Sequence, residues 1–111
     1  MYLLIEASST FTTLKELLES YPDDKDILYA KSDLKYIEIH LKNTHYVMRQ
    51  SLSDIMEILP NTHFIQTHRS YIINKYAVDQ IGPNYLKVNN QKIPISMTRK
   101  EEVLNNFQRL N

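Results

Sequence analysis

Apolar and polar residues alternate strictly along "YIEIHLK" (residues 36–42). In an extended chain Ile37, Ile39 and Leu41 point to one side, and the residues between them point to the other. A period of two is that of a strand with one buried face. The polar "KNTH" that follows can form a turn, and "YVMR" is predicted to return as the second strand of a hairpin.

Three other segments carry apolar residues at the spacing of an amphipathic helix. Their apolar positions are Leu14, Leu17, Leu18 and Tyr21 in the first, Leu52, Ile55, Met56 and Leu59 in the second, and Val103, Leu104, Phe107 and Leu110 in the third. Each segment is short, so the sequence predicts short helices.

Polar residues at capping positions support these helix starts. Thr13 with Glu16, and Thr98 with Glu101, have the spacing of a capping box before the first and third helices. Ser51 or Ser53 can cap the second helix. A proline follows each of the first two segments and ends it.

Two further stretches are β-prone. "YLKV" and "QKIPIS" flank Asn89-Asn90, and asparagine tolerates the positive φ of a tight hairpin turn. Pro94 cannot donate to a ladder, so its strand is expected to lie at a sheet edge or to end there. The run "FIQTHRSYIINKYAVDQI" (residues 64–81) begins as a strand and continues into a second apolar stretch, with "HRS" interrupting the pattern.

These patterns predict a mainly β fold with short peripheral helices. The polar turn "DDKD" is the best candidate for a boundary in the chain. We therefore expect residues 1–25 to form an N-terminal extension with a short helix, and residues 26–111 to form the main domain.

Length and composition agree with one domain of 111 residues. No apolar run approaches the roughly 20 residues of a membrane span, and the absence of cysteine fits a reducing cytoplasm. The net charge is zero but unevenly distributed: residues 1–60 hold 6 Lys and Arg against 10 Asp and Glu, whereas residues 61–111 hold 7 against 3. Such asymmetry indicates a charged partner.

Metal and catalytic sites are not predicted. The histidines fall as His40/His45 and His63/His68, a spacing of five that suits neither a helix face nor strand alternation, and no cysteine can complete a ligand set. Ser70 can share a strand face with His68, but no carboxylate stands nearby to orient a base. The single glycine excludes glycine-rich phosphate loops. We expect no enzyme activity, no metal and no cofactor.

The basic residues leave two interpretations open. Arg99 and Lys100 lie in the predicted first helical turn, where the macrodipole disfavours cations. They can face an external phosphate, or the neighbouring Glu101 and Glu102 can cancel them. Arg69 can equally lie on the wet face of an antiparallel sheet or contact phosphate or guanine.

Four blocks of the chain resemble, in order, the LytTR DNA-binding domain, the output module of many bacterial response regulators. The blocks are "DILYAKSDLKYIEIHL", "SLSDIMEILP", "FIQTHRSYIINKYAVDQI" and "LKVNNQKIPIS". The resemblance runs from about residue 26 to residue 110. Its most specific part is the HRSY-hydrophobic-Asn block, followed some twenty residues later by "IPIS".

The resemblance implies an elongated fold of small packed sheets and a bacterial, cytoplasmic transcription regulator of a two-component system. It also implies that loops enter successive major grooves of double-stranded DNA, that a second protomer binds a direct repeat, and that a receiver domain can precede the module. Three regions would face DNA: the loop "KSDLK" with Lys35, the "HRS" segment with His68 and Arg69, and the segment after "IPIS" with Arg99 and Lys100.

One position departs from the family pattern, which usually reads Ser-Arg where this chain has Ser96-Met97. An arginine that contacts bases is therefore expected to be missing. This keeps a second hypothesis open, a non-catalytic protein interaction module or an antagonist of a DNA-bound relative. A third hypothesis, in which the 8 tyrosines stack single-stranded bases, is weaker because tyrosine is also a good strand residue.

Overall fold

The computed structural model describes residues 11–108. Its α-helices are α2 (Leu14–Ser20), α3 (Leu52–Ile58) and α4 (Lys100–Gln108). Its strands are β1 (Tyr29–Asp33), β2 (Tyr36–His40), β3 (His45–Met48), β4 (Phe64–His68), β5 (Tyr71–Asn74), β6 (Gln80–Ile81), β7 (Tyr85–Val88) and β8 (Gln91–Pro94). Short 3-10 helices are η1 (Asp24–Asp26), η2 (Lys75–Ala77) and η3 (Met97–Arg99).

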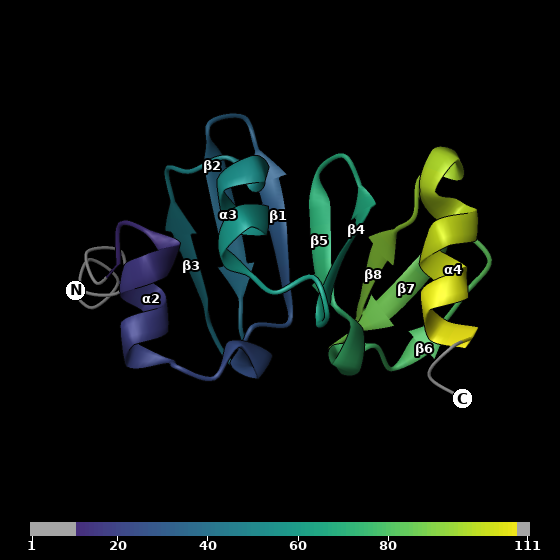
Figure 1. The fold of residues 1–111 in the computed structure, drawn as a ribbon, viewed down its shortest axis with the longest axis horizontal. Coiled ribbons are helices and arrows are strands. Elements are labelled where there is room, and N and C mark those ends of the chain that lie inside the picture. Colours follow the sequence, from purple (N-terminus) through teal and green to yellow (C-terminus); the bar gives the residue numbers. More distant parts are fainter. Residues whose placement is uncertain (1–10, 109–111) are drawn as a thin grey trace.

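The strands form two antiparallel sheets that stand side by side along the long axis of the molecule (Figure 1). The first has the order β3-β2-β1-β5-β4, and the second has the order β6-β7-β8. The molecule measures 43 × 27 × 26 Å. The prediction of an elongated, mainly β fold with short peripheral helices is confirmed.

The two faces of the first sheet bury two different cores, because neighbouring side chains on a strand point to opposite faces. On one face, Ala30 and Ile72 pack with residues of α2 and α3. On the other face, Tyr29 and Ile73 pack with residues of the second sheet and α4. Strands β1 and β5 therefore connect both cores.

Helix α2 lies within the predicted N-terminal extension and contributes to the first core. Leu14 and Leu17 are both fully buried there. Thr13 caps the helix by accepting from the Glu16 N–H, but the Glu16 carboxylate accepts from Thr12 instead of Thr13, so only half of the predicted capping box forms. The boundary after residue 25 stays a prediction.

The third predicted helix begins differently from the expectation. Thr98 lies inside η3, and α4 starts only at Lys100, so the capping box of Thr98 with Glu101 was wrong. Ser96 occupies the cap position before η3 without a capping bond from its side chain. Leu110, the last apolar residue predicted for this helix, lies outside the described residues.

The other turn and cap predictions are largely confirmed. Ser51 caps α3 in a complete capping box with Asp54. Asn89 and Asn90 have φ of 50° and 67° in the two-residue turn between β7 and β8. Met56, expected on the apolar face of α3, is instead 46% exposed.

A column of stacked rings crosses β1, β2 and β3 of the first sheet. The rings of Tyr29 and His40 stack with their centroids 4.3 Å apart, and the rings of His40 and His45 stack with their centroids 4.9 Å apart. Burial lowers the pKa of His40 and outweighs its hydrogen bond to Glu38, while the positive charges of His45 and Lys31 lower it further. The folded protein therefore holds His40 neutral to lower pH than the unfolded chain does.

The free energy of unfolding is expected to fall as the pH drops below 6.5, the ordinary pKa of histidine. In that range the unfolded chain binds a proton at His40 more readily than the folded protein does. Urea unfolding at several pH values, compared with His40→Gln, measures the effect. As the pH falls, the free energy of unfolding of the variant should decrease less than that of the wild type. An equal decrease in both proteins would exclude His40 as the cause.

Candidate nucleic-acid interface

Three connections of the fold reach the same edge, the upper one in Figure 1. They are the turn Leu34–Lys35 between β1 and β2, the turn Arg69–Ser70 between β4 and β5, and η3 with the start of α4. We call these the first, middle and third tips. They correspond to the three regions that the sequence resemblance placed toward DNA, so the fold brings these distant segments together.

Backbone hydrogen bonds join the three tips. The Ser32 N–H donates to the Ser70 carbonyl at 2.9 Å, which attaches the first hairpin to the middle tip. The Ser96 N–H donates to the Thr67 carbonyl at 2.9 Å, which attaches the residue before η3 to the strand of the middle tip. The spacing of the tips is therefore set by sheet-like bonds instead of by flexible side chains.

The middle tip is shaped by a bulge and by His68. The register of β4 and β5 shifts between Gln66 and His68, which leaves Thr67 as the extra residue of a β-bulge. The Ser70 N–H donates to His68 Nδ1 at 3.1 Å, so a neutral His68 carries its proton on Nε2. His68 thus stabilises the turn, and the exposed Arg69 occupies its tip.

A second cation, Arg49, lies beside the first tip and was missed by the sequence analysis. A shallow groove of about 270 Å³ is lined by Lys35 and Arg49 together with Leu34, Gln50, Ser51 and Asp54. Arg49 follows β3, whose last residue Met48 pairs with Ile37 near the start of β2. The pairing of a predicted hairpin was the signal that could have placed Arg49 beside Lys35.

The third tip presents half-buried Arg99 and Lys100. Lys100 Nζ donates to Asn84 Oδ1 at 3.4 Å. Among residues 11–108 the ion pairs within 4.0 Å are His40–Glu38 and His63–Asp24. Within that range, therefore, neither basic residue forms an ion pair with Glu101 or Glu102.

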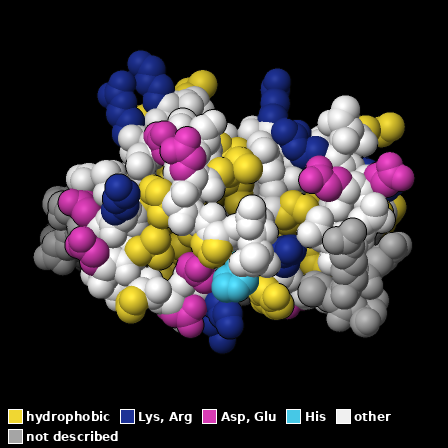
Figure 2. Space-filling model, in the orientation of Figure 1, with side chains coloured by type: hydrophobic (Ala, Val, Ile, Leu, Met, Phe, Trp, Pro, Cys, Tyr) yellow, Lys and Arg dark blue, Asp and Glu magenta, His cyan; other side chains and the backbone are white. Residues whose placement is uncertain are grey.

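Lys and Arg side chains project along the upper edge of the molecule, with hydrophobic side chains beside them over the β1–β2 hairpin (Figure 2). Acidic side chains gather mainly below this edge and over α4. The zero net charge of the chain therefore conceals a locally basic edge, which is the charge distribution that a phosphate backbone favours.

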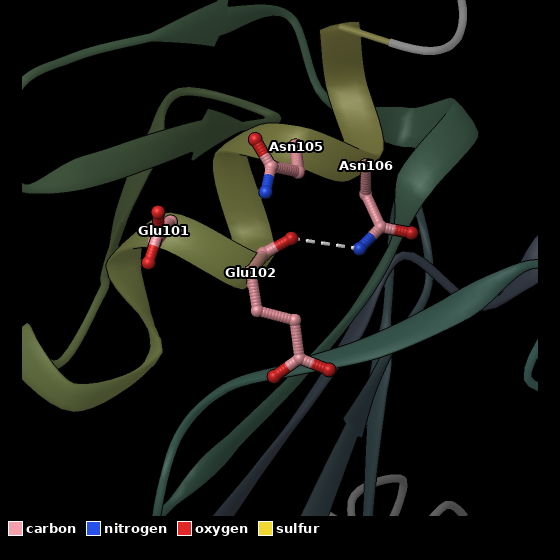
Figure 3. A pocket seen from close by; sticks show the side chains of 4 residues that line it. All are labelled: Glu101, Glu102, Asn105 and Asn106. Atoms are coloured by element: carbon pink, nitrogen blue, oxygen red, sulfur yellow. Dashed lines mark hydrogen bonds between the residues drawn. The ribbon is translucent and has the colours of Figure 1, made fainter.

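A hollow on α4 offers a different chemistry. It has a volume of about 400 Å³, lies on the polar side of α4 and is lined by Glu101, Glu102, Asn105 and Asn106, with Asn106 Nδ2 donating to the Glu102 carbonyl at 2.9 Å (Figure 3). Its carboxylates disfavour an anion. Within the described residues there is no cluster of three potential metal-ligating His, Cys, Asp or Glu side chains, and no helix there is long and apolar enough to cross a membrane.

A small β domain with joined cationic tips on one edge has the features of a nucleic-acid-binding module. The sequence profile of the LytTr DNA-binding domain matches residues 22–108, and the chain belongs to this family. The family assignment confirms the resemblance to the LytTR domain and identifies the chain as a DNA-binding, non-enzymatic module.

Curated relatives agree with this assignment. Sensory transduction protein LytT of Bacillus subtilis is 30% identical over 87 residues, which cover 73% of this chain and 36% of that protein. LytT of Enterococcus faecalis is 33% identical, over 70% of this chain and 35% of that protein. Transcriptional regulatory protein YpdB of Escherichia coli K12 is 26% identical, over 86% of this chain and 45% of that protein. The chain thus spans less than half the length of these relatives.

A solved structure shows the same fold. A LytTr DNA-binding domain from Bacillus cereus superposes with a TM-score of 0.69 at 21% sequence identity. The match covers 75% of this chain and 82% of that one.

Proposed function

We propose that this chain binds a specific sequence of double-stranded DNA by placing its three tips against the major groove and the flanking phosphates. The observation that carries the proposal is the joining of the tips through Ser32–Ser70 and Ser96–Thr67. An edge built in this way presents its cations at set positions, which lowers the ordering cost of binding.

The cations divide into two roles in this proposal. Lys35 on the first tip with Arg49 beside it, and Arg99 and Lys100 on the third tip, contact phosphates and fix the register. Arg69 stands between them and reaches a base edge, because its planar fork can pair with guanine O6 and N7. His68 acts through the turn that it holds.

A pair of protomers on a direct repeat completes the proposal. The family resemblance supports this arrangement, and the two copies would then read the same bases on the same face of the duplex. A receiver domain preceding the module is also part of the proposal, since the curated relatives are more than twice as long as the region they share with this chain.

Selection from a pool of random duplexes is expected to recover one motif, repeated about 10–10.5 base pairs apart. On the recovered duplex the logarithm of affinity should fall linearly with the logarithm of salt concentration, with a slope of about −0.9 for each phosphate contact. Titration at several salt concentrations measures this slope. Recovery of no motif would favour the protein interaction module instead, and a single unrepeated motif would exclude the paired arrangement.

A further inference from the structure

Leu34 and Met97 are unusually exposed for large apolar side chains. They are 97% and 88% exposed, whereas the other exposed large apolar side chains within residues 11–108 range from 46% to 59%. Leu34 is the first residue of the first tip, and Met97 is the first residue of η3 at the third tip. They therefore stand on either side of Arg69 on the basic edge.

Folding gives no reason for leucine at position 34. Its φ of 58° lies in the left-handed region, where a side chain with a Cβ is strained. The corresponding turn between β7 and β8 uses Asn89 and Asn90, residues that tolerate this conformation. Because Leu34 also buries almost none of its side chain, it contributes little packing to offset the strain.

The surroundings of the two side chains indicate what they contact. Leu34 shares its groove with Lys35 and Arg49, and Met97 is two residues from Arg99. The two apolar side chains lie on separate tips with the middle tip between them, so they do not form one continuous apolar patch for a protein partner. An apolar side chain among cations suits the major groove, where the thymine C5 methyl is the apolar feature.

We propose that Leu34 and Met97 contact thymine methyl groups, so that the recognised sequence carries A·T pairs on both sides of the position that faces Arg69. This inference rests on the proposed function and names the bases that its outer tips prefer. In this way Met97 would take part in base recognition although it replaces the arginine that the family pattern usually has at this position.

Replacing thymine by deoxyuridine tests the inference, because it removes the methyl group and keeps the hydrogen-bonding edge. The probe is the duplex recovered by selection, with uracil introduced at one position at a time. Affinity is expected to fall roughly fourfold for each contacted methyl group. Sensitive positions should lie on both sides of the position protected by Arg69.

Variants assign each sensitive position to its side chain. Leu34→Gly and Met97→Ala should each abolish the thymine preference at one flank, while Leu34→Met and Met97→Leu should retain it. The melting temperature of Leu34→Gly should be unchanged or higher, since glycine accepts the positive φ. Ile81→Ala, which shortens a 48% exposed side chain on β6 of the second sheet, is the matched control and should keep both preferences.

The outcomes separate this inference from the function on which it rests. Salt-dependent binding to a selected duplex, with no loss on uracil substitution, would overturn the role of Leu34 and Met97 and leave DNA binding intact. If uracil substitution lowers the affinity of the wild type, Leu34→Gly and Met97→Ala equally, the methyl groups act through DNA shape. That result would also overturn the role of Leu34 and Met97. Failure to recover any duplex would overturn both.

Discussion

Arg69→Ala is expected to weaken binding to the selected duplex by about 1–3 kcal/mol, or roughly 5–150-fold. Arg69 stands at the tip of the middle turn, between the other two tips, and its side chain is exposed. Within residues 11–108 it forms no ion pair, so its removal leaves no buried partner unsatisfied. The fold should therefore be unaffected, and equilibrium titration should isolate the loss of a DNA contact.

Two comparison variants define what this loss means. Lys25→Ala removes an exposed cation from η1, at the end of the first sheet opposite the tips, and should change affinity little. Arg69→Lys keeps the charge but cannot pair bidentately, so affinity for random duplex should persist while preference for the selected motif falls. If Arg69→Ala and Lys25→Ala bind equally well, Arg69 is a solvated turn residue.

Much of the fold could be predicted from the chain because its determinants are local. The alternation around Ile37 and Ile39 indicated a strand with one buried face, and both residues are fully buried. The Asn89-Asn90 pair predicted a tight turn, which the structure contains. Each of these features depends on residues that are close together in sequence.

The errors have a physical reason as well. The segment before α4 is attached through Ser96, whose N–H donates to the Thr67 carbonyl in a distant strand, and no local spacing indicates such a bond. Arg49 joins Lys35 only through the pairing of β2 with β3. The candidate site was therefore predictable as three separate segments, but its missing cation and its joining bonds required the tertiary structure.

The interruption at "HRS" shows how a local irregularity can have a structural cause. Sequence reasoning took it as a triplet that breaks an apolar pattern. In the structure Thr67 bulges, His68 accepts from the Ser70 N–H, and Arg69 occupies the turn between two strands of one hairpin. The break in the pattern is thus the turn itself.

The asparagine that ends the HRSY-hydrophobic-Asn block has a different role from the triplet that begins it. Asn74 is 1% exposed, and its Nδ2 donates to the Ile27 carbonyl at 3.0 Å and to the Lys25 carbonyl at 3.4 Å. Its Oδ1 accepts from the Tyr76 N–H at 2.9 Å. Asn74 therefore joins the segment before β1 to the end of β5, at the end of the sheet opposite the tips.

Asn74→Ala is expected to lower the free energy of unfolding by about 2–3 kcal/mol, because it leaves buried carbonyl and N–H groups without partners. Denaturant unfolding measures the loss. Asn105→Ala, at an exposed position on α4, is the matched control and should stay within about 0.5 kcal/mol of the wild type.

The same variant distinguishes a structural residue from one that contacts DNA. At a temperature where Asn74→Ala is folded, its affinity for the selected duplex should equal that of the wild type, since the three tips are attached to each other by bonds that Asn74 does not make. Reduced affinity of the folded variant would show that the packing of β5 against the segment before β1 controls the position of Arg69. Unchanged stability would show that water replaces the carboxamide without loss.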